Sequence, residues 1–256
     1  LLASFGFFGY TVSRLIKLFR LTKKENRFDK IGERTLTTLL VAFGQSKMMK
    51  KPVAGILHAL VWWGFLVITV GTLEMMIDGV ADTERVLSFF GIGYNLLTLS
   101  GELFAALIIL SCFIFLIRRY ITKPKRFIAP EMKPSSRLDA TVILALILLL
   151  MFSLLGMNLG YVVENKNNVE GSFPVSDLLL QIFPSISNLH LETFESVNWW
   201  IHIVLVLLFL NILPYSKHFH VIMSVPNVFF TRLEPKAKLD NMESVTKEVK
   251  LMLNPD

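Results

Sequence analysis

Long apolar runs separated by short polar segments dominate this chain. A helix that crosses the roughly 30 Å hydrocarbon layer of a bilayer needs about 20 mostly apolar residues. Five segments meet that length, at about 1–20, 53–77, 98–120, 138–160 and 197–217. The pattern predicts an all-α integral membrane protein whose five transmembrane helices form one bundle.

The composition strengthens this prediction. Hydrophobic residues make up 53% of the 256 positions, charged residues only 18%, and the mean hydropathy is +0.56. An ordinary soluble domain is less apolar and more charged. The single cysteine, Cys112, lies within a predicted span. This stretch of chain therefore holds no iron–sulfur cluster of its own, because such clusters need several thiolates.

The distribution of basic residues predicts the orientation. Of the 26 Lys and Arg residues, 24 lie in the segments 14–52 and 117–137 and in the tail from Lys217 onward. The other two connections carry one each, Arg85 and Lys166. Basic residues stay on the cytoplasmic side of short loops. We therefore expect the N-terminus outside and the C-terminus in the cytoplasm, in the plasma (inner) membrane of a prokaryote.

The same basic residues argue against nucleic acid as a partner. They flank apolar spans, and no nucleic-acid-binding motif accompanies them. Between the first two spans, residues 34–50 form a predicted amphipathic connector in the cytoplasmic headgroup layer of the lipid bilayer. Its apolar side chains follow helical spacing, at Leu36, Leu39, Leu40 and Phe43.

The five histidines are the candidate cofactor ligands. An unbroken helix turning about 100° per residue brings His220 to the face of His202 and places His218 about 160° away. His58, near the start of the second span, matches His220 in depth. One imidazole from each of two neighbouring helices suits a b-type haem, so we predict His58 and His220 as its axial ligands. The alternative is that both residues hydrogen-bond to headgroups or carbonyls at the membrane surface.

The stretch PYSKHFHVIMSVP (214–226) resembles the end of the fifth helix in the gamma, cytochrome b subunit of respiratory nitrate reductase. This resemblance covers nearly the whole chain. It implies that His58 and His220 hold an inner haem. It also implies that His202, eighteen residues before His220, ligates the iron of an outer haem.

Two longer segments carry a second resemblance. GQSKMMKKPVAGILHALVWWGFLVITVGT (44–72) and PYSKHFHVIMSVPNVFFTRLEPKAKLDNME (214–243) are similar to the haem-flanking segments of heterodisulfide-reductase-like membrane subunits. That resemblance implies a cytoplasmic iron–sulfur partner, either fused or separate, and exchange with menaquinone or ubiquinone. We expect residues 1–220 to form the cytochrome b domain, and the tail 221–256 to lead to the iron–sulfur module or dock on it.

One position departs from the nitrate reductase pattern. The second histidine of the second helix is replaced by Ile68, so an outer haem on His202 lacks its usual partner. Four hypotheses remain open. The iron is five-coordinate, His190 completes it, Met75 or Met76 does so, or the site is empty and His202 is a buried, hydrogen-bonded residue.

Acidic and aromatic side chains near the predicted outer surface are further candidates. Quinol loses two protons when it is oxidised, so a carboxylate near the outer haem is a candidate proton acceptor. The candidates are Glu74, Asp78 and Glu102. The alternative is that these carboxylates are only hydrated at the interface. Four tryptophans line a cofactor pocket or anchor the bundle in the headgroup layer, namely Trp62, Trp63, Trp199 and Trp200.

The sequence thus predicts an electron-transport protein, a quinone-linked membrane cytochrome b that serves as a subunit or domain of an oxidoreductase. The alternatives are a membrane anchor and a transporter, neither with a redox cofactor. A transporter is expected to have charged or Gly/Pro-interrupted helices near the midplane. The run TVILALILLLMFSLLG (141–156) is nearly continuous and apolar instead.

Overall fold

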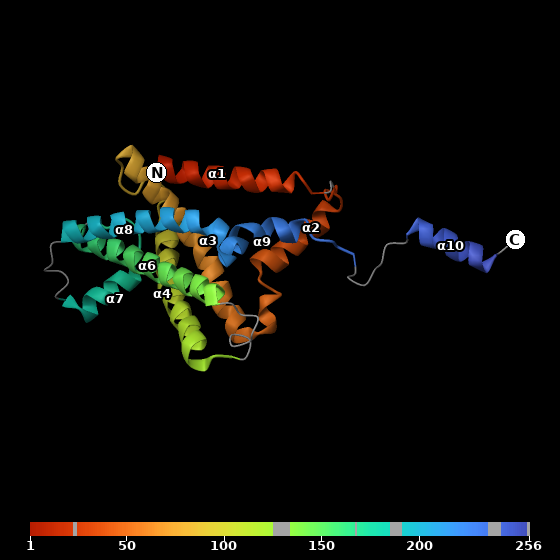
Figure 1. The fold of residues 1–256 in the computed structure, drawn as a ribbon. Helices are drawn as coiled ribbons and strands as arrows, with labels where there is room; N and C mark the ends of the chain where they lie inside the picture. Colours follow the sequence, from red (N-terminus) through yellow and green to blue (C-terminus); the bar gives the residue numbers. More distant parts are fainter. Residues whose placement is uncertain (23–24, 125–133, 167, 185–190, 235–241, 255–256) are drawn as a thin grey trace.

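The computed structural model describes residues 1–22, 25–124, 134–166, 168–184, 191–234 and 242–254. Within these ranges the chain is helical and contains no strand (Figure 1). The α-helices are α1 (Leu2–Phe19), α2 (Ile31–Thr38), α3 (Pro52–Ala81), α4 (Ile92–Ile117), α6 (Pro134–Glu164), α7 (Pro174–Ile182), α8 (Leu191–Ile212), α9 (His220–Phe229) and α10 (Glu243–Leu253). Helix α10 lies apart from the bundle in Figure 1.

Four helical segments of the described chain are long and apolar enough to cross a membrane. They are Pro52–Ala81, Ile92–Thr122, Leu138–Glu164 and Thr193–Tyr215. The all-α prediction is confirmed for the described residues, and the four candidate spans are consistent with a multi-pass membrane protein. The predicted span at 1–20 forms α1 but is not one of the four, and Arg14 and Lys17 interrupt its apolar run. The five-span count and the orientation therefore stay predictions.

Local signals explain where the second span begins and ends. Pro52 occupies the first turn of α3, where its missing N–H costs no hydrogen bond. Asp82 adopts a left-handed conformation with φ 54°, which ends the helix at Ala81. Helix α3 therefore runs slightly beyond the predicted 53–77 at both ends.

The core of the bundle lies between α3, α4, α6 and α8. Helix α8 packs on α6, α3 packs on α4, and α4 packs on α6. Glycines allow the closest approaches, because a Cβ on Gly64 would meet Phe104 and Ile108, and one on Gly160 would meet Glu195. At the far end of α3, Gly79 touches the ring of Trp199 on α8. These contacts bring polar side chains of four helices to one end of the bundle.

The amphipathic connector is shorter than predicted. Helix α2 continues through a π-helical turn at Leu39–Phe43, and Gln45, with φ 52°, then redirects the chain. Leu36, Leu39 and Leu40 are exposed, as a helix in the headgroup layer requires. The prediction of a single helix over 34–50 is wrong in its second half.

The last span is also not one unbroken helix. Helix α8 ends at Ile212, 3₁₀ turns follow at Leu213–Tyr215 and Lys217–Phe219, and α9 begins at His220. Pro214, which has no backbone N–H, lies at the break. Ser216 between the two turns is extended, with φ −98° and ψ 161°. The helical phase predicted for His218 and His220 therefore does not apply.

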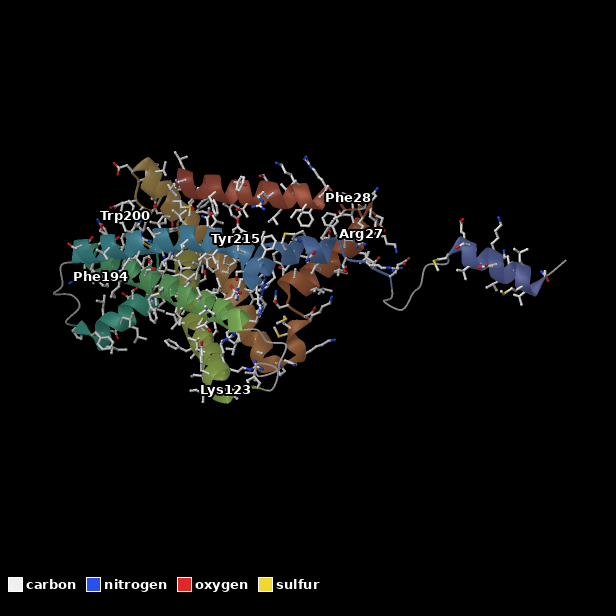
Figure 2. The ribbon with its side chains drawn as sticks, in the orientation of Figure 1. Arg27, Phe28, Lys123, Phe194, Trp200 and Tyr215 are labelled. Carbon is white, nitrogen blue, oxygen red and sulfur yellow. The ribbon has the colours of Figure 1, made fainter. Side chains whose placement is uncertain are left out.

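Helix α9 is held against α2 by a buried arginine. Arg34 is 4% exposed and donates hydrogen bonds to the carbonyls of Phe229 (3.0 Å) and Thr231 (2.7 Å), and to Asp29 (2.8 Å). Its hydrogen bond lowers the pKa of the Asp29 carboxyl. Arg27 adds a bond to the Phe230 carbonyl beside the end of α9 (Figure 2).

Replacing Arg34 by leucine is expected to free α9, because it leaves the two carbonyls without their charged donor. Each such hydrogen bond contributes about 1.5–3 kcal/mol. Hydrogen exchange of residues 220–231 in detergent should rise at least tenfold, while α4 stays protected. Arg20→Leu, at an exposed position, is the matched control. Unchanged exchange in the Arg34 variant would show that α9 does not depend on this contact.

Candidate functional site

His58 and His220 face each other at the end of the bundle near α2. Their ring centroids lie 6.1 Å apart and their planes differ by 25°. Metal–imidazole nitrogen bonds of about 2 Å place two rings on opposite sides of one metal roughly 6 Å apart, centroid to centroid. The observed separation therefore fits two axial ligands of a single metal centre.

The hydrogen bonds around these histidines also fit ligand roles. The Nδ1 atom of His220 lies 2.9 Å from the Lys217 carbonyl, which leaves Nε2 available for a metal. On α3, His58 Nδ1 and Trp62 Nε1 are buried without any hydrogen-bond partner. They lie one turn apart on the same helix face. Buried polar atoms are rarely unpaired, so this pair supports a bound group between α3 and α9.

His218 lies closer to this pair than predicted. Its ring centroid is 5.8 Å from that of His220, so the prediction that it occupies the opposite face is wrong. The cause is the break in the helix before His220. The Nδ1 atom of His218 contacts Ser216 Oγ at 3.1 Å. Burial, with a further effect of His220, lowers the pKa of His218 to about 4.

His202 is deeply buried between α6 and α8. It is 1% exposed, and its Nδ1 lies 3.1 Å from the Leu150 carbonyl and 3.0 Å from Ser153 Oγ. A carbonyl only accepts, so Nδ1 carries the proton and Nε2 carries the lone pair. That Nε2 is buried without a partner. It is therefore available to a metal in an apolar environment.

Two of the residues expected near His202 line one cavity. Ile68 packs against the apolar core and lines this cavity, but it offers no ligand atom. Met75 is buried and lines the same cavity, as does Trp199, one turn from His202 on α8. His190 lies outside the described residues.

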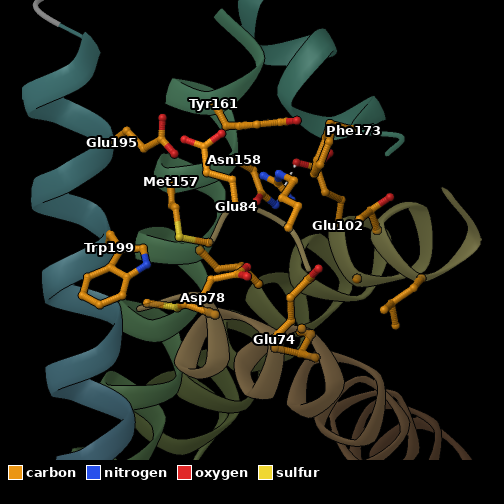
Figure 3. Close-up of a pocket in the computed structure, with 18 of the residues that line it drawn as sticks. Glu74, Asp78, Glu84, Glu102, Met157, Asn158, Tyr161, Phe173, Glu195 and Trp199 are labelled. Carbon is orange, nitrogen blue, oxygen red and sulfur yellow. Dashed lines mark hydrogen bonds between the residues drawn. The ribbon is translucent and has the colours of Figure 1, made fainter. Parts of the chain in front are cut away.

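That cavity, of about 290 Å³, lies between α3, α4, α6 and α8 at the other end of the bundle from His58 and His220. Figure 3 shows acidic and aromatic side chains of four helices lining it. All three predicted proton acceptors are among them, so the structure brings Glu74, Asp78 and Glu102 to one site.

Each of these three carboxylates also holds backbone in place. Glu74 accepts from the N–H of Leu87, and Asp78 accepts from the N–H of Val86, so the two fix the loop after α3. Glu102 is 0% exposed and accepts from the N–H groups of Val175 (2.8 Å) and Ser176 (3.1 Å). It also accepts from the Ser176 hydroxyl.

Glu102 thus caps the N-terminus of α7, where backbone N–H groups lack helical partners. The alternative that Glu102 is only hydrated at the membrane interface is therefore wrong, because its carboxylate is buried.

Sequence reasoning missed Arg85. Its guanidinium carbon lies 3.6 Å from the ring centroid of Tyr161 and 4.8 Å from that of Phe173, and it donates to the Tyr94 hydroxyl at 3.0 Å. Arg85 therefore places a positive charge inside the cavity. Arg85 is the only basic residue between the second and third apolar runs. That feature of the sequence could have indicated a specific role for it.

Glu164 on α6 and Glu195 on α8 were also missed. Both line the cavity, and the Glu195 carboxyl has Glu164, Arg85 and Glu84 as charged neighbours. Glu195 precedes Trp199 by one turn and His202 by about two, so the three share one face of α8. That spacing was the sequence signal for Glu195.

Two curated proteins are similar to this chain. The probable iron-sulfur-binding oxidoreductase FadF of Bacillus subtilis is 30% identical over 239 residues, which cover 92% of this chain and 32% of that protein. The EtfAB:quinone oxidoreductase of Syntrophomonas wolfei is 24% identical over 242 residues, covering 91% of this chain and 32% of that protein. No family model and no solved structure matches.

The chain spans about a third of the length of both relatives. Its homologues are oxidoreductases, which is consistent with the heterodisulfide-reductase-like class. The resemblance to the nitrate reductase subunit stays a prediction.

Proposed function

We propose that this chain is a membrane cytochrome b that transfers electrons between a quinone pool and a cytoplasmic iron–sulfur module. The observation that carries the proposal is the approach of His58 and His220, whose ring centroids lie 6.1 Å apart although the two residues are far apart in the sequence. The unpaired Nδ1 of His58 supports a cofactor at this place.

A b-type haem bound there would supply reversible one-electron chemistry. The chain would supply the two imidazoles. The Lys217 carbonyl would orient the His220 ring. The buried indole N–H of Trp62 is available as a donor to a polar group of the cofactor.

The names of the relatives support the two ends of the proposed electron path. One is an iron-sulfur-binding oxidoreductase and the other a quinone oxidoreductase. In this chain the proposed inner haem lies beside α9, which leads into the tail and would face the iron–sulfur partner. The acidic cavity lies at the opposite end and would face the quinone. A membrane anchor needs neither feature.

The test is electron transfer from a quinol to the purified protein in detergent. Menadiol and decylubiquinol serve as naphthoquinol and benzoquinol probes under anaerobic conditions. The expected result is reduction of a b-type haem by one of them, followed by absorbance. A haem that dithionite reduces but neither quinol reduces would contradict the quinone link.

The second part of the proposal is an outer haem ligated by His202 through Nε2. Its support is the buried, unpaired Nε2 atom and the fixed Nδ1 proton. The identity of the opposing ligand stays a hypothesis, with His190 and Met75 as alternatives to a five-coordinate iron.

Replacing His202 by leucine is expected to remove one spectral component and leave the component that depends on His58. The reason is that the two places are separate: His202 lies in the middle of α8, packed against α6, whereas His58 on α3 meets His220 at the start of α9, beyond the break at Leu213–Phe219. Low-temperature difference spectra of the variant measure this. Loss of all haem signal in His202→Leu would contradict two separate sites, and an unchanged spectrum would contradict the outer haem.

A further inference from the structure

We propose that the cavity at the outer end binds the quinone head group, with Arg85 donating to a ring oxygen and the Glu164–Glu195 pair exchanging its protons. The inference rests on the proposed function and assigns the reacting groups of its quinone site. It differs from the sequence-based prediction, which placed the proton acceptor at Glu74, Asp78 or Glu102.

The three predicted acceptors are committed to holding backbone. Glu74 and Asp78 accept hydrogen bonds from N–H groups of the loop after α3, and Glu102 caps α7. A backbone N–H can only donate, so it requires an acceptor oxygen that stays in place. Repeated protonation of these carboxylates during turnover would disturb the walls of the cavity.

The carboxyl groups of Glu164 and Glu195 are arranged differently. Both line the cavity, from α6 and α8, which pack closely at Gly160, and the two carboxyl groups are neighbours. Two neighbouring carboxylates repel each other, so one shared proton stabilises the pair. Such a pair takes up a second proton and releases it again without losing a backbone contact. The partial burial of Glu195 and the exposure of Glu164 give the proton a route from the cavity to water.

Arg85 is placed to bind an oxygen of the ligand. Its guanidinium lies over the Tyr161 ring and near Phe173, and Tyr94 accepts one of its hydrogen bonds. A guanidinium has five N–H donors, so further donors are available in the cavity. These can bind a quinone carbonyl or a quinol hydroxyl oxygen.

The remaining wall of the cavity suits an aromatic ring. Val67, Leu97, Leu154, Met157 and Trp199 provide apolar surface. A volume of about 290 Å³ lies at the lower limit for ligand pockets, about 300 Å³, and is adequate for a quinone head group.

In quinol oxidation at this site, the electrons would go to the haem of the proposed function and the protons to the acid pair. Oxidation of one quinol breaks two O–H bonds and releases two protons and two electrons, leaving the quinone with two carbonyls. The protons pass one after the other to Glu195, and through Glu164 to water. The electrons pass one at a time to an oxidant of the b-type haem class. Quinone reduction runs the same steps in reverse.

The test compares the kinetics of haem reduction by menadiol and decylubiquinol in matched variants of the full chain. Glu195→Gln is expected to lower the maximal rate about 100-fold, the usual effect of removing a general base. Haem content and the dithionite-reduced spectrum should not change. Glu195→Asp should recover part of the rate. Arg85→Gln should instead raise the KM for quinol about tenfold, because it removes a charge-assisted hydrogen bond.

Glu170→Gln, at an exposed position on the same side of the protein, is the control and should match the wild type. If Glu195→Gln loses haem, Glu164→Gln takes its place, with an expected tenfold or greater loss of rate.

Two results would overturn the assignment. A wild-type rate in both the Glu195→Gln and Glu164→Gln variants would remove the acid pair from the reaction while leaving the proposed function intact. A wild-type protein whose haem dithionite reduces but neither quinol reduces would overturn the quinone site and the quinone link together.

Discussion

Replacing either His58 or His220 by alanine is expected to remove the same b-type haem from the protein. The two rings lie 6.1 Å apart in the structure, so each variant would remove one of the two imidazoles that hold the proposed haem. Difference spectra of the purified variants should lack the same low-spin component, and the haem content should fall by one per chain. This is the largest effect that we expect from a single substitution.

His218→Gln is the matched control, because His218 lies two residues from His220 and its ring is 5.8 Å from that of His220. Its Nδ1 is already bound to Ser216, so the variant should keep the haem. Loss of the haem in His218→Gln and its retention in His220→Ala would exchange the roles of the two residues.

Replacing Glu102 by leucine is expected to have the second largest effect, on stability. The variant leaves the N–H groups of Val175 and Ser176 and the Ser176 hydroxyl without their acceptor in a buried place. Each buried unsatisfied group costs about 1–3 kcal/mol, so the free energy of unfolding should fall by about 3 kcal/mol or more. Thermal unfolding in detergent and hydrogen exchange of residues 174–182 measure the change.

Glu102→Gln separates the capping role from a role in proton transfer. Glutamine keeps one acceptor oxygen, so this variant should be destabilised by less than half as much and should oxidise quinol at nearly the wild-type rate. A stable Glu102→Gln protein with a rate lowered about 100-fold would identify Glu102 as the proton acceptor instead of Glu195.

The membrane helices were predictable from the sequence because a span depends mainly on the length and apolarity of a run. The helices α3, α4, α6 and α8 accordingly contain most of the predicted spans. The pairing of His58 with His220 in depth also followed from their places at the ends of two spans. The structure brings the two rings to 6.1 Å.

Other features depend on local breaks that periodicity does not describe. The predicted position of His218 on the opposite face from His220 was wrong. The prediction assumed an unbroken helix, whereas the chain leaves the α-helix between Leu213 and Phe219, around Pro214. The helix predicted for the connector ends at Phe43, because Gln45 takes a left-handed conformation and turns the chain.

The acidic cavity was predictable only in part. Polar residues near the ends of apolar runs indicated Glu74, Asp78 and Glu102, and all three line it. The carboxyl contact between Glu164 and Glu195 depends on the close packing of α6 and α8 at Gly160, which brings the Glu195 backbone against α6. The position of Arg85 over Tyr161 depends on the path of the loop after α3. Neither contact follows from sequence spacing alone.

The central claim is that His58 and His220 hold a b-type haem. The most direct measurement is the pyridine haemochrome assay on the purified wild-type chain, with the reduced-minus-oxidised spectrum recorded on the same sample. The account predicts at least one haem b per chain with a low-spin spectrum. Protein that is folded by circular dichroism and purified from haem-replete cells, yet contains no haem b, would contradict it.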